Sequence, residues 1–191
     1  MVITQDNVND DIRMISDSLT ANGKVLVRPI AALKVAFFLP MTILAGYLLA
    51  MSWLAMTYTP YTNAFGDVIT FGRAMSAEIA TVGFCTLFAL FIGVALYGPS
   101  LAYLSVPEKT RIDSVVITSL RKTGMKLVTG ILVINWTVAL LACLVDSTFI
   151  CASPFILLLS VFLLQWVISA EVTRYGMSSL MTKLTKLAKK I

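Results

Sequence analysis

Four long runs of apolar residues dominate the pattern of hydrophobic and polar positions along the chain. They cover residues 35–58, 77–105, 127–145 and 153–172. Each run is near or above the roughly 20 residues that an α-helix needs to cross the hydrocarbon core of a bilayer. Because the runs are continuously apolar rather than alternating, they predict helices and not the strands of a barrel. We therefore expect an all-α, polytopic membrane protein with four transmembrane helices.

Amphipathic segments flank this membrane domain, which we assign to residues 35–173. In the N-terminal segment, residues 1–34, apolar side chains recur every three or four positions, at Val8, Ile12, Ile15 and Leu19. This period predicts a short helix, whose apolar side rests on the bilayer, on the protein's own loops or on a partner. A second in-plane or docked helix is expected after Pro107, between the second and third spans.

The tail, residues 174–191, is predicted to form a basic amphipathic helix. Its lysines, set against an apolar face, are Lys183, Lys186, Lys189 and Lys190. Helices of this kind bind anionic lipid through their cations and the acyl boundary through their apolar side. We expect the lysines to contact lipid headgroups, with a groove on a partner protein as the alternative.

Charge sets the expected orientation of the spans. Only 13% of the residues are charged and 58% are hydrophobic, which is too apolar for a water-facing surface. Of the 15 Lys and Arg residues, all except Arg73 lie in the N-terminal segment, the middle loop or the tail. The positive-inside rule therefore predicts that both termini are cytoplasmic. The same asymmetry explains the net charge of +5, so nucleic acid is not an expected partner.

Small residues four positions apart predict close helix packing in the first two spans. The pairs are Gly46 with Ala50 and Ala89 with Gly93. Residues without a bulky side chain let two helix backbones approach each other in lipid. Such surfaces suit packing within the chain or self-association.

Two amides, Asn135 and Gln165, stand out in the third and fourth spans, which form a hairpin around the short loop 146–152. Asn135 lies eight residues and Gln165 seven residues from the cytoplasmic end of its run, which is a depth of roughly 11–12 Å at helical rise. Because the depths match, we predict an interhelical hydrogen bond between the two amides. The alternative is that both side chains face a polar permeation path.

The sequence contains few residues that could catalyse a reaction or bind a cofactor or metal. It contains no histidine, no phosphate-binding loop and no ionisable side chain near the middle of a span, so we expect no catalytic residue, no cofactor and no metal site. Cys143 and Cys151 fall at the outer end of the hairpin, where an oxidising compartment would permit a disulfide; free thiols are the alternative.

In organisation the whole chain resembles small inner-membrane proteins encoded on mobile elements. The features shared are its length, its spans and a short acidic amphipathic segment ahead of them, with Asp6, Asp10, Asp11 and Asp17. TraS-like entry-exclusion proteins of F-type conjugative plasmids have such a segment and block redundant DNA transfer. Immunity proteins for pore-forming colicins are similar in size, include a group with four spans and keep both ends in the cytoplasm.

These resemblances imply a non-enzymatic protein of the bacterial inner membrane that acts through contacts with another membrane protein. Entry exclusion is the role that the resemblance favours. Immunity against a pore-forming toxin and a scaffold subunit of a secretion complex are the alternatives, and a small transporter or channel is the least favoured.

Overall fold

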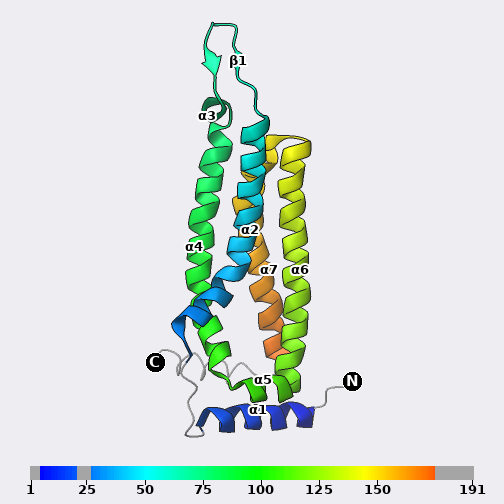
Figure 1. Ribbon diagram of the computed structural model, residues 1–191. Helices are drawn as coiled ribbons and strands as arrows, with labels where there is room; N and C mark the ends of the chain where they lie inside the picture. The colour runs from blue at the N-terminus through cyan, green and yellow to red at the C-terminus, as the bar shows by residue number, and fades with distance from the viewer. Residues whose placement is uncertain (1–4, 21–26, 175–191) are drawn as a thin grey trace. The chain divides into compact units, whose positions relative to one another are not determined.

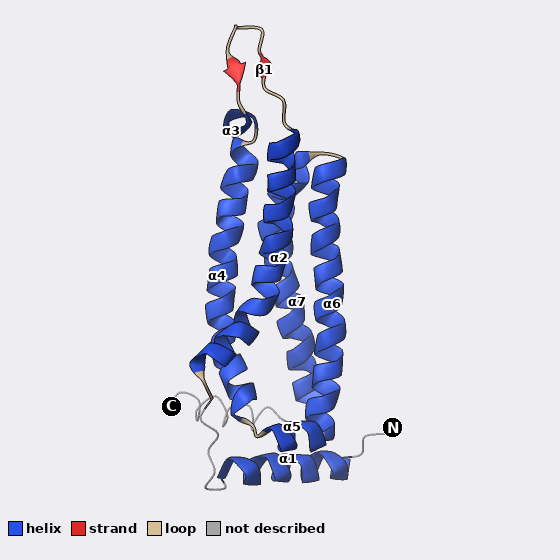
Figure 2. Cartoon of the chain, viewed as in Figure 1, coloured by secondary structure: helices blue, strands red, loops and turns tan. Residues whose placement is uncertain are grey.

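The computed structural model describes residues 5–20 and 27–174 of the chain. Its helices are α1 (Gln5–Thr20), α2 (Pro29–Thr57), α3 (Phe71–Ala74), α4 (Ser76–Ser105), α5 (Glu108–Asp113), α6 (Val115–Leu144) and α7 (Ser153–Arg174), with the strands β1 (Tyr61–Thr62) and β2 (Val68–Ile69) and the 3-10 helix η1 (Ser147–Ala152) (Figure 1). Helix dominates the described chain (Figure 2). Four helical segments are long and apolar enough to cross a membrane: Pro29–Thr57, Ser76–Ser105, Val115–Leu144 and Ser147–Arg174. The predicted all-α fold with four transmembrane helices is confirmed.

The helix following Pro107 differs from the prediction. Only Glu108–Asp113 forms a separate helix, and the rest of the predicted segment makes the first turns of α6, which begins at Val115 instead of residue 127. The break falls at Ser114, whose backbone is extended (φ −71°, ψ 121°). The Ser114 hydroxyl accepts a hydrogen bond from the N–H of Ile117 at 3.1 Å, which is the capping pattern that starts a new helix.

The chain divides into two compact units, and α2, α4, α6 and α7 each contribute segments to both. The first unit comprises residues 1–37, 93–128 and 162–191, and includes α1 and α5. The second comprises residues 38–92 and 129–161, and includes the strands, α3 and η1.

In the first unit, α1 packs through its apolar side on the start of α6, beside α5 (Figure 1). The cluster consists of buried Val8, Ile15, Val116 and Val172, with Ile12, Ile117 and Leu120 packed against it. The amphipathic helix predicted around these positions is confirmed, and of the three surfaces considered for its apolar side, the structure uses the protein's own. The Leu19 side chain lies outside the described part of the structure.

A buried carboxylate fixes the position of α1 on α6. Asp11 is 9% exposed, and its Oδ2 accepts hydrogen bonds from the N–H of Val116 at 2.9 Å and from the hydroxyl of Ser114 at 3.1 Å. The first N–H groups of a helix have no acceptor within the helix, and the positive end of its dipole favours an anion. Asp11 and Ser114 together therefore supply the acceptors that α6 lacks.

Replacing Asp11 with Ala should release α1, because the substitution leaves the Val116 N–H without its acceptor while the apolar cluster stays intact. We expect the docking of α1 to weaken by about 1–2 kcal/mol. Hydrogen–deuterium exchange of residues 5–20 and 115–120 in mild detergent measures this change. Asp10→Ala is the matched control, since Asp10 is the exposed neighbour of the same type. Equal exchange in the two variants would show that the Asp11 carboxylate does not hold the helix.

Candidate functional site

The second unit buries a polar cluster, which we call the Asn135 cluster and which consists of Tyr47, Asn135 and Ser160. Asn135 is 1% exposed and Tyr47 is fully buried. The Asn135 amide nitrogen donates to the Ser160 hydroxyl at 3.1 Å and to the carbonyl of Ile131 at 2.9 Å. Its oxygen accepts from the Tyr47 hydroxyl at 3.3 Å, and Ser160 in turn donates to the carbonyl of Ile156. The cluster therefore joins α2, α6 and α7.

The partner of Asn135 on α7 is Ser160, so the predicted pairing with Gln165 is wrong in its second member. The prediction matched the two amides by depth alone. Ser160 and Gln165 are five residues apart, which separates them by about 140° around a helix axis, so only one of them can face α6. Gln165 is exposed. Because both donors and the oxygen of Asn135 are already engaged, the cluster is explained as an interhelical contact and needs no permeation path.

The predicted small residues Gly46 and Ala50 lie buried on α2 against α6. A Cβ placed on Gly46 would lie 3.1 Å from the indole of Trp136, so the ring occupies the space that a side chain would need. The indole N–H also donates to the carbonyl of Thr42 at 3.2 Å, one turn earlier. The Cys143 thiol donates to the carbonyl of Ala50 at 3.8 Å. Close approach of the two backbones thus brings α2 carbonyls within reach of α6 side chains.

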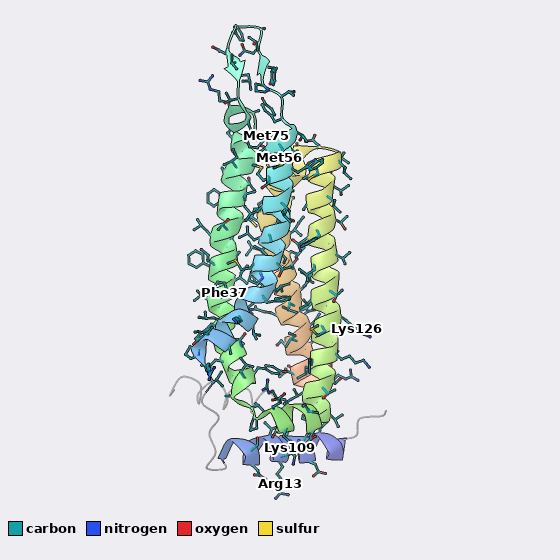
Figure 3. The ribbon with its side chains drawn as sticks, in the orientation of Figure 1. Arg13, Phe37, Met56, Met75, Lys109 and Lys126 are labelled. Carbon is teal, nitrogen blue, oxygen red and sulfur yellow. The ribbon has the colours of Figure 1, made fainter. Side chains whose placement is uncertain are left out.

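The second predicted pair, Ala89 and Gly93, is buried on α4. Ala89 belongs to the second unit, whereas Gly93 belongs to the first, in which it faces the ring of Phe37. Figure 3 labels Phe37 on α2. A Cβ on Gly93 would overlap that ring. The absence of a side chain at Gly93 therefore leaves the space that the Phe37 ring of α2 occupies.

The three cysteines are free thiols in the structure. The candidate disulfide between Cys143 and Cys151 is not formed, because Cys143 on α6 points to the carbonyl of Ala50 while Cys151 lies in η1. The predicted headgroup contacts, Lys183, Lys186, Lys189 and Lys190, lie outside the described residues.

The loop between α6 and α7 is fixed to α4 by polar and apolar contacts. Asp146 caps η1 by accepting from the N–H of Thr148 at 2.8 Å and from its hydroxyl, and these bonds lower the pKa of the Asp146 carboxyl. Ser147 donates to the carboxylate of Glu78 at 2.9 Å. Buried Ile150 packs with Val82 and Ala142.

A β-hairpin that the sequence analysis missed connects α2 to α3, and it extends beyond the ends of α2 and α4 (Figure 1). In its antiparallel strands, Tyr61 is opposite Ile69 and Thr62 is opposite Val68. The Asn63 side-chain oxygen accepts from two backbone N–H groups, those of Phe65 at 3.0 Å and Asp67 at 2.9 Å. Gly66 has φ +83°, a conformation that costs glycine little. Asn63 and Gly66, which lie between two short β-favouring segments, were the sequence signal from which this hairpin could have been predicted.

Contacts of Tyr58 hold the base of the hairpin in place, and the surface of the hairpin is apolar. The Tyr58 hydroxyl donates to the carbonyl of Ile69 at 3.0 Å, and its ring meets Phe71 edge to face with centroids 5.7 Å apart. Phe65 at the turn is 91% exposed, and Tyr61 and Val68 are each 58% exposed. Large apolar side chains held exposed in a fixed turn are typical of contact surfaces.

Within residues 5–20 and 27–174, no group of three His, Cys, Asp or Glu side chains could hold a metal ion. No family model, curated protein or solved structure shows significant similarity to the chain. The fold itself defines the class, an all-α protein with four helices that can span a membrane.

Replacing Asn135 with Leu should destabilise the second unit, because it leaves the Tyr47 hydroxyl without an acceptor and the Ser160 hydroxyl without its donor. We expect a loss of about 1–2 kcal/mol, which lowers the melting temperature in mild detergent by roughly 2–6 °C. Thr137→Val is the control, since the exposed Thr137 hydroxyl bonds only the carbonyl of Val133 in its own helix. An unchanged melting temperature for Asn135→Leu would contradict this role of the amide.

Gly46→Leu should also destabilise the protein, because the new side chain displaces the Trp136 ring and breaks its bond to Thr42. Overpacking of this kind costs about 1–3 kcal/mol. Gly83→Leu is the matched control, because nothing lies within 4 Å of a Cβ placed on Gly83. Thermal melting, with Trp fluorescence to follow the ring, distinguishes the variants. Equal stability of the two would rule out a tight α2–α6 contact.

Proposed function

We propose that the protein is a non-enzymatic recognition protein of a bacterial inner membrane that acts by contacting another membrane protein, with plasmid entry exclusion as its role. The observation that carries the proposal is the hairpin between α2 and α3, which presents Tyr61, Phe65 and Val68 on a fixed turn. The organisation shared with TraS-like proteins supports the particular role.

The hairpin suits recognition because its conformation is set before any partner arrives. The Asn63 bonds and the Tyr58 anchor order the turn, so binding would lose little conformational entropy. Exposed aromatic side chains supply much of the energy at protein interfaces. In the orientation predicted from the basic residues, this loop lies on the side opposite both termini, where a protein of another membrane or another cell can reach it.

Immunity against a pore-forming toxin is the second candidate, since a toxin inserting from outside would meet the same hairpin. A transporter or channel is less favoured, because Asn135, one of the two amides that raised the idea, has both donors and its oxygen engaged inside the protein. A secretion scaffold would use helix faces instead of the hairpin.

Substituting Phe65 with Ser should abolish recognition while leaving the fold intact, because the side chain is 91% exposed. We expect plasmid transfer into cells that carry the protein to rise by about tenfold or more, the loss typical of an aromatic at the centre of an interface. Phe91→Ser on α4 is the control, with a Phe that is 71% exposed on a membrane-spanning helix. The amounts of the Phe91 and Phe65 variants in the membrane are compared with the amount of the wild type.

Survival after exposure to pore-forming colicins is measured in the same strains. A Phe65 effect on survival alone would select immunity over exclusion. If deletion of the whole chain changes neither plasmid transfer nor survival, both roles are wrong.

A further inference from the structure

Gln165 is an exposed amide in the middle of an apolar helix. Its neighbours on α7 include Phe162 and Trp166, which are 65% and 72% exposed. Among the residues that the structure describes, none forms a hydrogen bond with the Gln165 side chain. Gln165 lies nine residues before Arg174 at the end of α7, which is roughly 13 Å along the helix.

Three threonines exposed on the spanning helices, in contrast, have hydrogen-bond partners within their own helices. The hydroxyls of Thr81, Thr137 and Thr173 donate to carbonyls four residues earlier in their own helices, at 2.7–2.8 Å. A Gln amide has two donors and an acceptor, and in lipid none of them can be satisfied by water. Its side chain is also too short to reach the headgroups from this depth, unlike Lys or Arg near a helix end.

The surface beside Gln165 carries a small side chain, which lets another helix approach closely. Ser169 follows Gln165 by one turn and is exposed like Ala170. Small side chains one turn from a polar one are the usual composition of helix contacts in membranes.

We propose that this face of α7, defined by Phe162, Gln165, Trp166 and Ser169, binds the same face of a second copy of the chain. The two Gln165 amides then pair reciprocally across a two-fold axis parallel to the membrane normal. An amide carries both a donor and an acceptor, so it is complementary to its own copy. Copies inserted in the same direction also place Gln165 at the same depth, whereas a different protein would need a polar group of its own at that level. The inference does not depend on the proposed function.

The test uses the full-length protein in liposomes, with donor- and acceptor-labelled copies whose energy transfer is followed as lipid is added. We expect a dimer in the wild type and a dissociation constant roughly 3–30-fold higher for Gln165→Leu, which is the effect of losing interhelical hydrogen bonds. Gln165→Leu should fold normally, since it removes a polar group from a lipid-facing position. Thr137→Val is the control and should dimerise like the wild type, because its hydroxyl is satisfied within α6.

Photocrosslinking in native membranes gives a readout that does not depend on replacing Gln165. A photoreactive phenylalanine analogue at position 162 should yield a homodimer, whereas the same group at Phe84 of α4, which is 60% exposed, should not. A wild type that stays monomeric at every lipid ratio would overturn the proposal. So would a dimer that Gln165→Leu leaves unchanged, or crosslinks from position 162 only to a different protein.

Discussion

Lipid cannot hydrogen-bond a polar group, and this constraint accounts for most of what the structure shows. It requires each apolar run to be a helix, because only a helix pairs its backbone within one segment. It also requires polar side chains in the spans to find partners in the protein. The Asn135 cluster does so between helices, the exposed threonines do so with their own backbones, and the Trp136 indole does so with a carbonyl of α2. Each of these contacts has a structural explanation.

Polar groups with complete hydrogen bonds inside the protein differ from those that need a partner outside it. Asn135 looked as suited to a permeation path as Gln165 did, yet its bonds are complete within the second unit. In the first unit, the carboxylate of Asp11 is buried but supplies an acceptor that the start of α6 needs. Two exposed groups differ from these, because no contact within the described residues covers or pairs them: the apolar tip of the hairpin and the Gln165 amide. These are where contacts with other molecules are expected.

Structural features that depend on composition and on the spacing of apolar residues could be predicted from the sequence. Features that depend on single tertiary contacts could not. The four spans and the amphipathic α1 could be predicted because long apolar runs and a helical period of apolar residues do not depend on particular tertiary contacts. The start of α6 could not be predicted, because Ser114 ends one helix and begins the next with help from Asp11, which is 103 residues away in sequence. Depth counted from the ends of the apolar runs did not identify the partner of Asn135, because Ser160, which bonds it, precedes Gln165 by five residues, about 7.5 Å of rise and 140° of rotation along α7. Likewise, the contact of Cys143 with Ala50 could not be inferred from its distance to Cys151 in the sequence.

The central expectation is that the four apolar helices cross a bilayer with the basic segments on the cytoplasmic side. Protease digestion of tags fused to the two ends, in intact spheroplasts and after permeabilisation, tests this directly. Both tags should survive in intact spheroplasts and be removed only after permeabilisation. Removal of either tag from outside would contradict the topology on which the roles of the hairpin and of Gln165 are built.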